Sequence, residues 1–305
     1  MKKLTRKLFI SVLVAVFAFV ALGTSTYAWI TLSNNAEVNA FEAQIEAGEA
    51  GIELSEDYAG DVEAAKWTTS LTLTGPFTTK LNDVTMEYDA DGNMKFYDFK
   101  SVYDEDEGKN SMEIDKVDNL PQAEVDYIEF SIWMKRTNST DALATTTVKV
   151  NGAKVAFALP EGASAEGEFT YKNGDTTVSQ SNLYAYNAAR LSITAVVDGE
   201  EEKDNTVIYE QKAGTDPETE NTAGYSATGF AHKYAESQDI TIEGTGPAYS
   251  NVLQAGNDSE GFIVLTGNDP VELKVRVWIE GWDNECHAQI LTQKLSVAFG
   301  FEIVG

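Results

Sequence analysis

The acidic run at residues 113–118 has a spacing that carboxylates can use in glycoside hydrolysis. Glu113, Asp115 and Asp118 stand at i, i+2 and i+5. On a β-strand the first two side chains share a face, where a nucleophile and an acid/base could flank a sugar bond. The third acid is one methylene shorter than the glutamate of that pattern, and a turn-like Asn-Leu follows it. An acidic strand or turn is therefore the favoured interpretation, and a jelly-roll glycosidase is the minor alternative.

A second acidic stretch carries the oxygen ligands that calcium prefers. Asp89, Asp91 and Asn93 alternate along the sequence Asp-Ala-Asp-Gly-Asn. Gly92 falls two residues early for a calcium-binding hand, and the twelfth position is Lys100 in place of a glutamate. A hairpin turn fits the same residues. Calcium is thus the single cofactor that the sequence suggests.

No other combination of residues predicts catalysis. The histidines are His232 and His287, and neither belongs to the His-Glu-x-x-His pattern of zinc proteases. Cys286 adjoins His287, and neighbours on a strand point to opposite faces, so they are poorly placed as a nucleophile and its base. We therefore expect no enzyme activity. Because Cys286 is the sole cysteine, no intrachain disulfide can form, and we expect this side chain to fill a small buried or half-buried site.

Three tryptophans are expected on strand faces opposite the core: Trp133, Trp278 and Trp282. Surface aromatic rings can stack on sugar rings or pack against a neighbouring subunit. Inserted loops that cover the second face of the sheet would explain the same pattern. The choice between these interpretations stays open from the sequence.

Residues 1–28 have the layout of a secretory signal peptide. Four basic residues precede an uncharged apolar stretch of 15 residues, and small residues, Thr26 and Ala28, stand at −3 and −1 of the expected cleavage site. The apolar stretch is shorter than the roughly 20 residues of a spanning helix. We expect cleavage after Ala28 and a secreted, extracellular or cell-surface protein. The alternative is a retained anchor, which would be the chain's one contact with the membrane.

The mature chain is strongly acidic. Without the four basic residues of the signal, 18 basic residues stand against 49 acidic ones, a net charge of −31. Such a field repels nucleic acids and anionic lipid surfaces and keeps the protein soluble. A nucleic-acid-binding function is therefore disfavoured.

The remaining pattern is that of β-structure. Val271–Glu280 alternates strictly between apolar and polar residues, as a strand with one buried face does. Residues 295–301 and Tyr127–Lys135 alternate in the same way. Tight hairpins are predicted at Asp91-Gly92, Asn151-Gly152, Asn173-Gly174 and Asp198-Gly199, the last of which opens an acidic loop to Asp204. Weaker strands are expected at 41–45, 51–54, 95–102, 146–150, 154–159, 191–197, 207–211 and 262–266, and short helices at 61–67 and 285–292.

These elements predict an all-β protein, an antiparallel, jelly-roll-like β-sandwich with short helical insertions. Residues 29–305 are expected to form a single large domain, because no repeat or linker divides them. The first mature residues are notable for an apolar series ahead of the first turn: Trp29, Ile30, Leu32, Val38, Phe41 and Ile45. Such a terminal segment can pair with an open sheet edge of another chain or serve as an ordinary first strand of its own.

The N-terminal 55 residues or so resemble exported Firmicutes proteins of the TasA/camelysin type. The resemblance rests on Thr26–Thr31 around the cleavage site, on Asn39–Ala43, on Glu46–Gly48 and on Ile52–Leu54. It differs by extra residues between Phe41 and Gly48. The resemblance implies a jelly-roll sandwich, export by a dedicated signal peptidase, and assembly into extracellular matrix fibres in which residues 29–47 complete a neighbour's sheet. Nothing in this chain carries over the proteolysis associated with camelysin.

Three functions therefore compete. The first is a secreted structural protein that forms fibres or matrix through its N-terminal strand, with copies of itself or other surface proteins as partners. The second is a monomeric surface adhesin or binding module for carbohydrate or calcium. The third is the glycosidase at Glu113–Asp118. The resemblance favours the first.

Overall fold

The structure is a computed structural model, and it describes residues 41–47, 51–73, 81, 83–104, 109–115, 120–123, 125–137, 143–158, 169–173, 176–180, 184–211, 241–242, 252–281, 283, 286, 293 and 295–304. Predictions for residues 1–40, for Asp118, for both histidines and for Trp282 fall outside these residues. Within them the chain consists mostly of β-strands, nearly all of which belong to two large mixed sheets. The prediction of an all-β protein is confirmed.

The smaller of the two large sheets contains both the first and the last described strand. Its order is β16, β8, β18, β1 and β3, with β9 also paired to β18. β18 pairs in parallel with β1 and antiparallel with β8 and β9. The strands are β1 (Phe41–Glu46), β3 (Ser70–Leu73), β8 (Thr145–Val150), β9 (Ala156–Ala158), β16 (Ile263–Thr266) and β18 (Leu295–Ile303).

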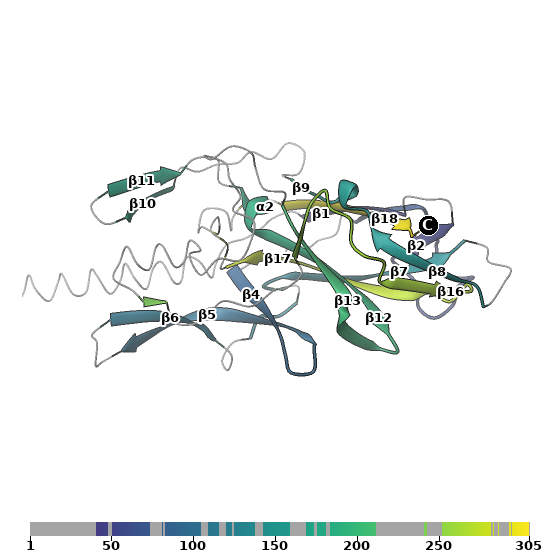
Figure 1. Ribbon diagram of the computed structural model, residues 1–305, viewed down its shortest axis with the longest axis horizontal. Helices are drawn as coiled ribbons and strands as arrows, with labels where there is room; N and C mark the ends of the chain where they lie inside the picture. The colour runs from purple at the N-terminus through teal and green to yellow at the C-terminus, as the bar shows by residue number, and fades with distance from the viewer. Residues whose placement is uncertain are drawn as a thin grey trace, which may run out of the picture.

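The larger sheet has ten strands in the order β14, β6, β5, β4, β17, β12, β13 and β15, with β7 paired to β17 and β2 paired to β7. Its β5–β6 hairpin extends away from the end of the molecule that holds the C-terminus (Figure 1). The strands are β2 (Ile52–Ser55), β4 (Asp83–Tyr88), β5 (Met94–Asp104), β6 (Lys109–Asp115), β7 (Ile128–Arg136), β12 (Ala189–Val197), β13 (Glu200–Glu210), β14 (Thr241–Ile242), β15 (Val252–Gln254) and β17 (Val271–Glu280).

The other described elements are short. β10 (Phe169–Asn173) and β11 (Thr176–Gln180) form a separate hairpin, and two short helices are present, η1 (Gly152–Lys154) and α2 (Ala185–Ala188). The helix predicted at 61–67 is wrong: this stretch forms a turn in which the amide of Ala65 donates to the carbonyl of Asp61. Most of the helix predicted at 285–292 lies outside the described residues.

The main core lies between the two large sheets and follows from the alternation of apolar residues along the strands. Leu273, Val275 and Val277 of β17 are fully buried in one cluster with Val297 and Phe299 of β18. β17 matches its predicted bounds, and β1, β7, β12, β16 and β18 match theirs closely. The two buried faces account for the sandwich-like architecture.

The outer face of the larger sheet is covered as well, so the expectation of a polar, solvent-facing row on β17 is wrong. Arg276 is 6% exposed, and Trp278 and Glu280 are fully buried. The β4–β5 hairpin packs over this face, and Met86 and Phe96 contact Trp278 in a second apolar cluster. Trp278 is therefore a core residue of this second layer and not an exposed aromatic.

The predicted turns have mixed outcomes. Asp198 and Gly199 form the two-residue loop between β12 and β13, with φ of 53° and 84°, as a hairpin with two left-handed residues requires. Asp91-Gly92 lies in the β4–β5 hairpin, and Asn173 is the last residue of β10, one position before the loop. The hairpin at Asn151-Gly152 is wrong, because β8 and β9 both pair with β18 and Asn151 caps η1 between them.

Two further expectations are corrected. The sheets are mixed, since β1, β4, β14 and β15 each make a parallel pair, so the fold is not purely antiparallel. Residues 200–204, expected as an acidic loop, form the first half of β13. This extension of β13 creates the site described next.

Candidate functional site

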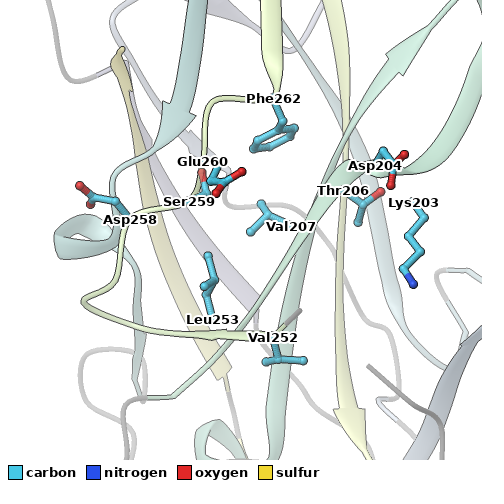
Figure 2. Close-up of a pocket in the computed structure, with 10 residues that line it drawn as sticks. All are labelled: Lys203, Asp204, Thr206, Val207, Val252, Leu253, Asp258, Ser259, Glu260 and Phe262. Carbon is cyan, nitrogen blue, oxygen red and sulfur yellow. The ribbon is translucent and has the colours of Figure 1, made fainter. Parts of the chain in front are cut away.

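A pocket of about 760 Å³ lies where the edges of the two sheets come together. One side is formed by β13 and β15, and the other by the loop that leads into β16 (Figure 2). Ten residues line it: Lys203, Asp204, Thr206, Val207, Val252, Leu253, Asp258, Ser259, Glu260 and Phe262. We call this pocket the edge groove.

The edge groove follows the side of a strand and not its face. Thr206 and Val207 are consecutive and therefore point to opposite faces of the sheet, yet both line the groove. On this side β13 pairs only with β15, through Ile208, Tyr209 and Glu210. Along 203–207 no described strand pairs with this edge. β16, beyond the opposite wall, is the outermost of the described strands in its sheet.

Apolar side chains at the margin of the sandwich core make the groove floor. Val207 is 6% exposed and belongs to the main core cluster, and the half-buried Leu253 and Phe262 pack against that cluster. Figure 2 shows Val207 between Phe262 above and Leu253 below. The groove thus opens directly onto the layer between the sheets.

The loop wall of the groove is held by a network of polar contacts. The Lys149 ammonium lies 2.8 Å from Asp258 and 2.7 Å from Glu302, and the amide of Gly152 donates to Asp258 at 2.9 Å. The hydrogen bond from Lys149 and that from the Gly152 amide hold the pKa of Asp258 below its usual value. The same carboxylates raise the pKa of Lys149. These charges are therefore paired inside the wall.

Two further hydrogen bonds fix the loop to the sheets. The amide of Val150 donates to the hydroxyl of Ser259 at 2.9 Å, and the hydroxyl of Tyr209 donates to the carbonyl of Asn257 at 3.0 Å. Burial raises the pKa of the Tyr209 phenol, so this donor stays protonated. The wall is anchored to both sheets at once.

The charged rim carries one cation and two carboxylates besides Asp258. The ammonium of Lys203 lies 5.3 Å from the ring centre of Tyr88, over its face. Asp204 and Glu260 are exposed, and neither has a hydrogen bond or ion pair in the described part of the chain. The groove therefore combines an apolar floor, an acidic rim and a strand edge that is unpaired within the described part of the chain.

The predicted assembly strand is only partly within the described residues. Phe41 and Ile45 lie in β1, which pairs with β18 on one side and β3 on the other, and Ile45 is fully buried. In this chain β1 is thus an internal strand of its own sheet. Trp29, Ile30, Leu32 and Val38, with the cleavage residues Thr26 and Ala28, lie outside the described residues.

The predicted calcium residues form a hairpin turn. The carboxylate of Asp89 accepts hydrogen bonds from the amides of Asp91 and Asn93, at 3.0 and 2.9 Å. The hydrogen bond from the Asn93 amide is the main reason that the pKa of Asp89 is lowered. Among the described residues no group of three or more His, Cys, Asp or Glu side chains could hold a metal ion.

The residues of the glycosidase pattern lie far from the edge groove in the topology. Glu113 and Asp115 are in β6, opposite Lys100 and Asp98 of β5. β6 lies next to β14 at the end of the larger sheet, and Asp118 is outside the described residues.

One aromatic cluster does lie at the surface. The rings of Tyr58 and Trp133 are 4.7 Å apart, and Trp67 is 5.9 Å from Tyr58. Lys135 points its ammonium over Trp67 and pairs with Glu53 at 2.6 Å. These rings are half-buried and tilted against one another, so most of their area packs within the cluster.

Cys286 is buried in the main core cluster and forms no disulfide, as expected for the sole cysteine in a small buried site. No helix among the described residues is long and apolar enough to cross a membrane. No protein-family model, curated protein or solved structure matches the chain.

The sequence reasoning missed the edge groove entirely. Its residues come from β13, β15 and the 255–262 loop, which share no motif. The length of β13 was the one signal that could have indicated the groove. It was missed because residues 200–204 at the start of the strand are charged and were interpreted as a loop.

Proposed function

We propose that the chain is a secreted structural protein, a subunit of an extracellular fibre or matrix that assembles by strand addition. The observation that carries the proposal is the edge groove, where a strand edge that no described strand pairs with borders an apolar floor between two sheets. An incoming extended segment can gain main-chain hydrogen bonds from β13 and bury alternate apolar side chains on Val207, Leu253 and Phe262. Unpaired edges of this kind are normally protected in monomeric proteins.

The donor in this proposal is the segment Trp29–Ala40 of a neighbouring copy. β1 is held between β3 and β18, so its removal from the home sheet would expose the core residues Ala43 and Ile45. The segment ahead of it supplies apolar residues without that loss: Trp29, Ile30, Leu32 and Val38. The TasA/camelysin resemblance supports donation by the N-terminal segment, because that segment completes a neighbour's sheet in those proteins. It also implies a jelly-roll order of strands, which we include in the proposal.

Export belongs to the same proposal. The protein is released after Ala28 and works outside the cytoplasm, with no enzyme activity. Its partners are copies of itself or other surface proteins.

The test compares the mature chain that begins at Trp29 with one that begins at Phe41, by electron microscopy and light scattering. We expect filaments or large assemblies from the first and monodisperse monomers from the second, with matching circular dichroism spectra. Monomers from both chains would contradict the proposal. Assemblies that persist in the shorter chain would show that another surface joins the subunits.

The alternative of a carbohydrate-binding module has one favourable observation, the surface cluster of Tyr58, Trp67 and Trp133. Partly exposed rings of this kind can stack on sugars. A glycan array with the mature chain and its Trp133→Ala variant tests it. Binding that is lost in the variant would support this function, and an array without binding would end it.

A further inference from the structure

We infer that β16 pairs edge to edge with the β16 of a second copy of this chain, antiparallel and about a two-fold axis. The inference goes beyond the proposed function, because it concerns the smaller sheet and does not depend on donation of the N-terminal segment. β16 lies beside β8 near the C-terminus (Figure 1), and no described strand pairs with its other side.

The main chain of Val264 turns its hydrogen-bonding groups toward this free edge. The carbonyl of Thr147 accepts from the amide of Val304 at 2.9 Å, so Thr147 directs its main chain toward β18. Val264 lies opposite Thr147 on the other side of β8. Because hydrogen-bonded and non-hydrogen-bonded pairs alternate along an antiparallel ladder, these two residues form a non-hydrogen-bonded pair. The N–H and C=O of Val264 therefore point away from β8.

The surface around this edge is uncharged. No charged side chain occurs at 261–268 in and around β16, at 142–148 in and before β8, or at 303–304 at the end of β18, in a chain with a net charge of −27. Edge strands of monomeric proteins are normally protected by charges, prolines or bulges, and β16 contains no charge and no proline. Three of the six large apolar side chains that are exposed in the described residues lie here: Leu143 at 85%, Val264 at 53% and Val304 at 44%.

A second copy is the partner that fits this edge. Two copies of so acidic a chain repel one another where their charged surfaces meet, and this uncharged area lets them approach. A two-fold axis through Val264 sets this residue opposite its counterpart, and the two exchange both main-chain hydrogen bonds. The same register sets Ile263 opposite Leu265 of the second copy, so buried residues stay on the core face and exposed ones on the outer face.

The described hydrogen bonds favour this axis over one through Leu265. An axis through Leu265 would pair Val264 with Thr266, whose carbonyl already accepts from the amide of Asp269 at 3.1 Å. With the axis through Val264, the central pair uses groups that no described hydrogen bond occupies.

The contact is small. One short strand edge and a few side chains bury less than the roughly 1,200 Å² of a stable complex. We therefore expect separate subunits to stay monomeric at micromolar concentration. Copies aligned in a fibre would repeat the contact many times, and two fibres would then associate side by side through it.

Disulfide trapping tests this pairing in the mature chain. In a Cys286→Ser background, Val264→Cys places a thiol next to the axis, where the two Cα atoms of a hydrogen-bonded pair are about 5.5 Å apart and within disulfide range. After oxidation we expect at least tenfold more dimer on a non-reducing gel than from Val197→Cys, which replaces a side chain of similar exposure, 48%, at the β12–β13 turn. Thr266→Cys is the register control. Its two copies would lie about 13 Å apart along the strands, so it should cross-link no more than Val197→Cys.

The outcomes separate this inference from strand donation, because the detergent gel detects the dimer whether or not filaments form. Filaments without a Val264→Cys dimer overturn the inference and leave strand donation standing. A Val264→Cys dimer without filaments supports the inference and contradicts the proposed function. Equal dimer from Val264→Cys and Val197→Cys, or more dimer from Thr266→Cys than from Val264→Cys, overturns the inference.

Discussion

At the scale of single residues, the outer face of the larger sheet holds buried charges that alternation alone would place in water. Arg190 is 1% exposed, and its guanidinium lies 2.6 Å from Asp283 and 3.2 Å from Glu210. Burial disfavours the charged guanidinium, but the carboxylates of Asp283 and Glu210 outweigh it and raise the pKa of Arg190. Arg190 and the two carboxylates therefore stabilise one another, because loss of either sign of charge would leave the other buried without its counter-charge.

Replacing Arg190 by methionine should therefore destabilise the protein strongly. The loss leaves Asp283 and Glu210 without their cation, and we expect the free energy of unfolding to fall by about 3–5 kcal/mol. Lys154→Met is the matched control, since its pair with Glu46 is about half exposed on both sides, and should change stability by less than about 1 kcal/mol. Urea unfolding measures both; equal, small effects would contradict the buried-pair account.

Gly152 is required by a close approach to the groove wall. A Cβ at this position would lie 2.0 Å from the carbonyl oxygen of Asn257. Because that atom is backbone, Gly152→Ala should shift the 255–262 loop and lower the free energy of unfolding by about 1–3 kcal/mol. Ala153→Ser, at the exposed next residue, should be neutral in the same urea titration. If Gly152→Ala unfolds at the same urea concentration as the wild type, the close packing of η1 on the loop is wrong.

At the scale of elements, a ladder of ion pairs joins β7, β17 and β13 beneath the β4–β5 hairpin. Arg276 contacts Glu129 at 2.5 Å and Glu201 at 2.6 Å, and Lys274 contacts Glu201 at 2.5 Å. Burial alone would raise the pKa of Glu201, but the hydrogen bond from Lys274 and the charge of Arg276 lower it overall. The folded-state pKa therefore lies below the ordinary value of 4.5.

This shift predicts a loss of stability in acid. A carboxylate with a depressed pKa stabilises the fold at pH values above about 4.5 and loses that contribution as the pH falls toward its folded-state pKa. Glu201→Gln should lower the free energy of unfolding by about 1 kcal/mol at pH 7, because the pairs are partly exposed, and the difference from wild type should shrink by pH 3. The exposed Glu200→Gln is the control. A difference that is independent of pH would exclude titration of this ladder.

The elements also show how far a sequence can predict this fold. The alternating apolar rows of β17 and β18 predict these strands to within two residues, because each row packs into the main core. The Asp198-Gly199 hairpin was predictable because the loop needs two left-handed residues. The Asn151-Gly152 hairpin failed because the same dipeptide can cap a short helix, and only the long-range pairing of β8 and β9 with β18 decides between them.

The candidate site could not be predicted from the sequence for a related reason. The edge groove depends on which strand edges are left unpaired, a property of the sheet order and not of any local pattern. Trp278 shows the same limit: its alternation with core residues was recognised, but the β4–β5 hairpin that covers it comes from a distant part of the chain. The acidic motifs at 89–93 and 113–118 were conspicuous, yet Asp89, Asp91 and Asn93 form a turn, and Glu113 and Asp115 lie in β6.

At the scale of the whole molecule, the larger sheet is covered on both faces, and along residues 203–207 no described strand pairs with its β13 margin. The second apolar cluster covers the outer face of the larger sheet, whereas the buried Val207 and the half-buried Leu253 and Phe262 line the edge groove, where no described strand pairs with β13. Residues 29–36 carry no charged side chain, so the first part of the proposed donor avoids repulsion by this acidic chain. Strand addition at this margin is the mode of association that we propose.

Interchain cross-linking tests this central claim most directly. In a Cys286→Ser background, one mature chain carries Leu32→Cys and a second carries Thr206→Cys, which lines the groove; Ala64→Cys, exposed and outside the groove, replaces Thr206→Cys in the control. After the two chains are mixed and oxidised, we predict a disulfide-linked heterodimer for Leu32→Cys with Thr206→Cys and almost none with Ala64→Cys. Equal cross-linking to both positions, or none to either, would contradict donation of the N-terminal segment into the edge groove.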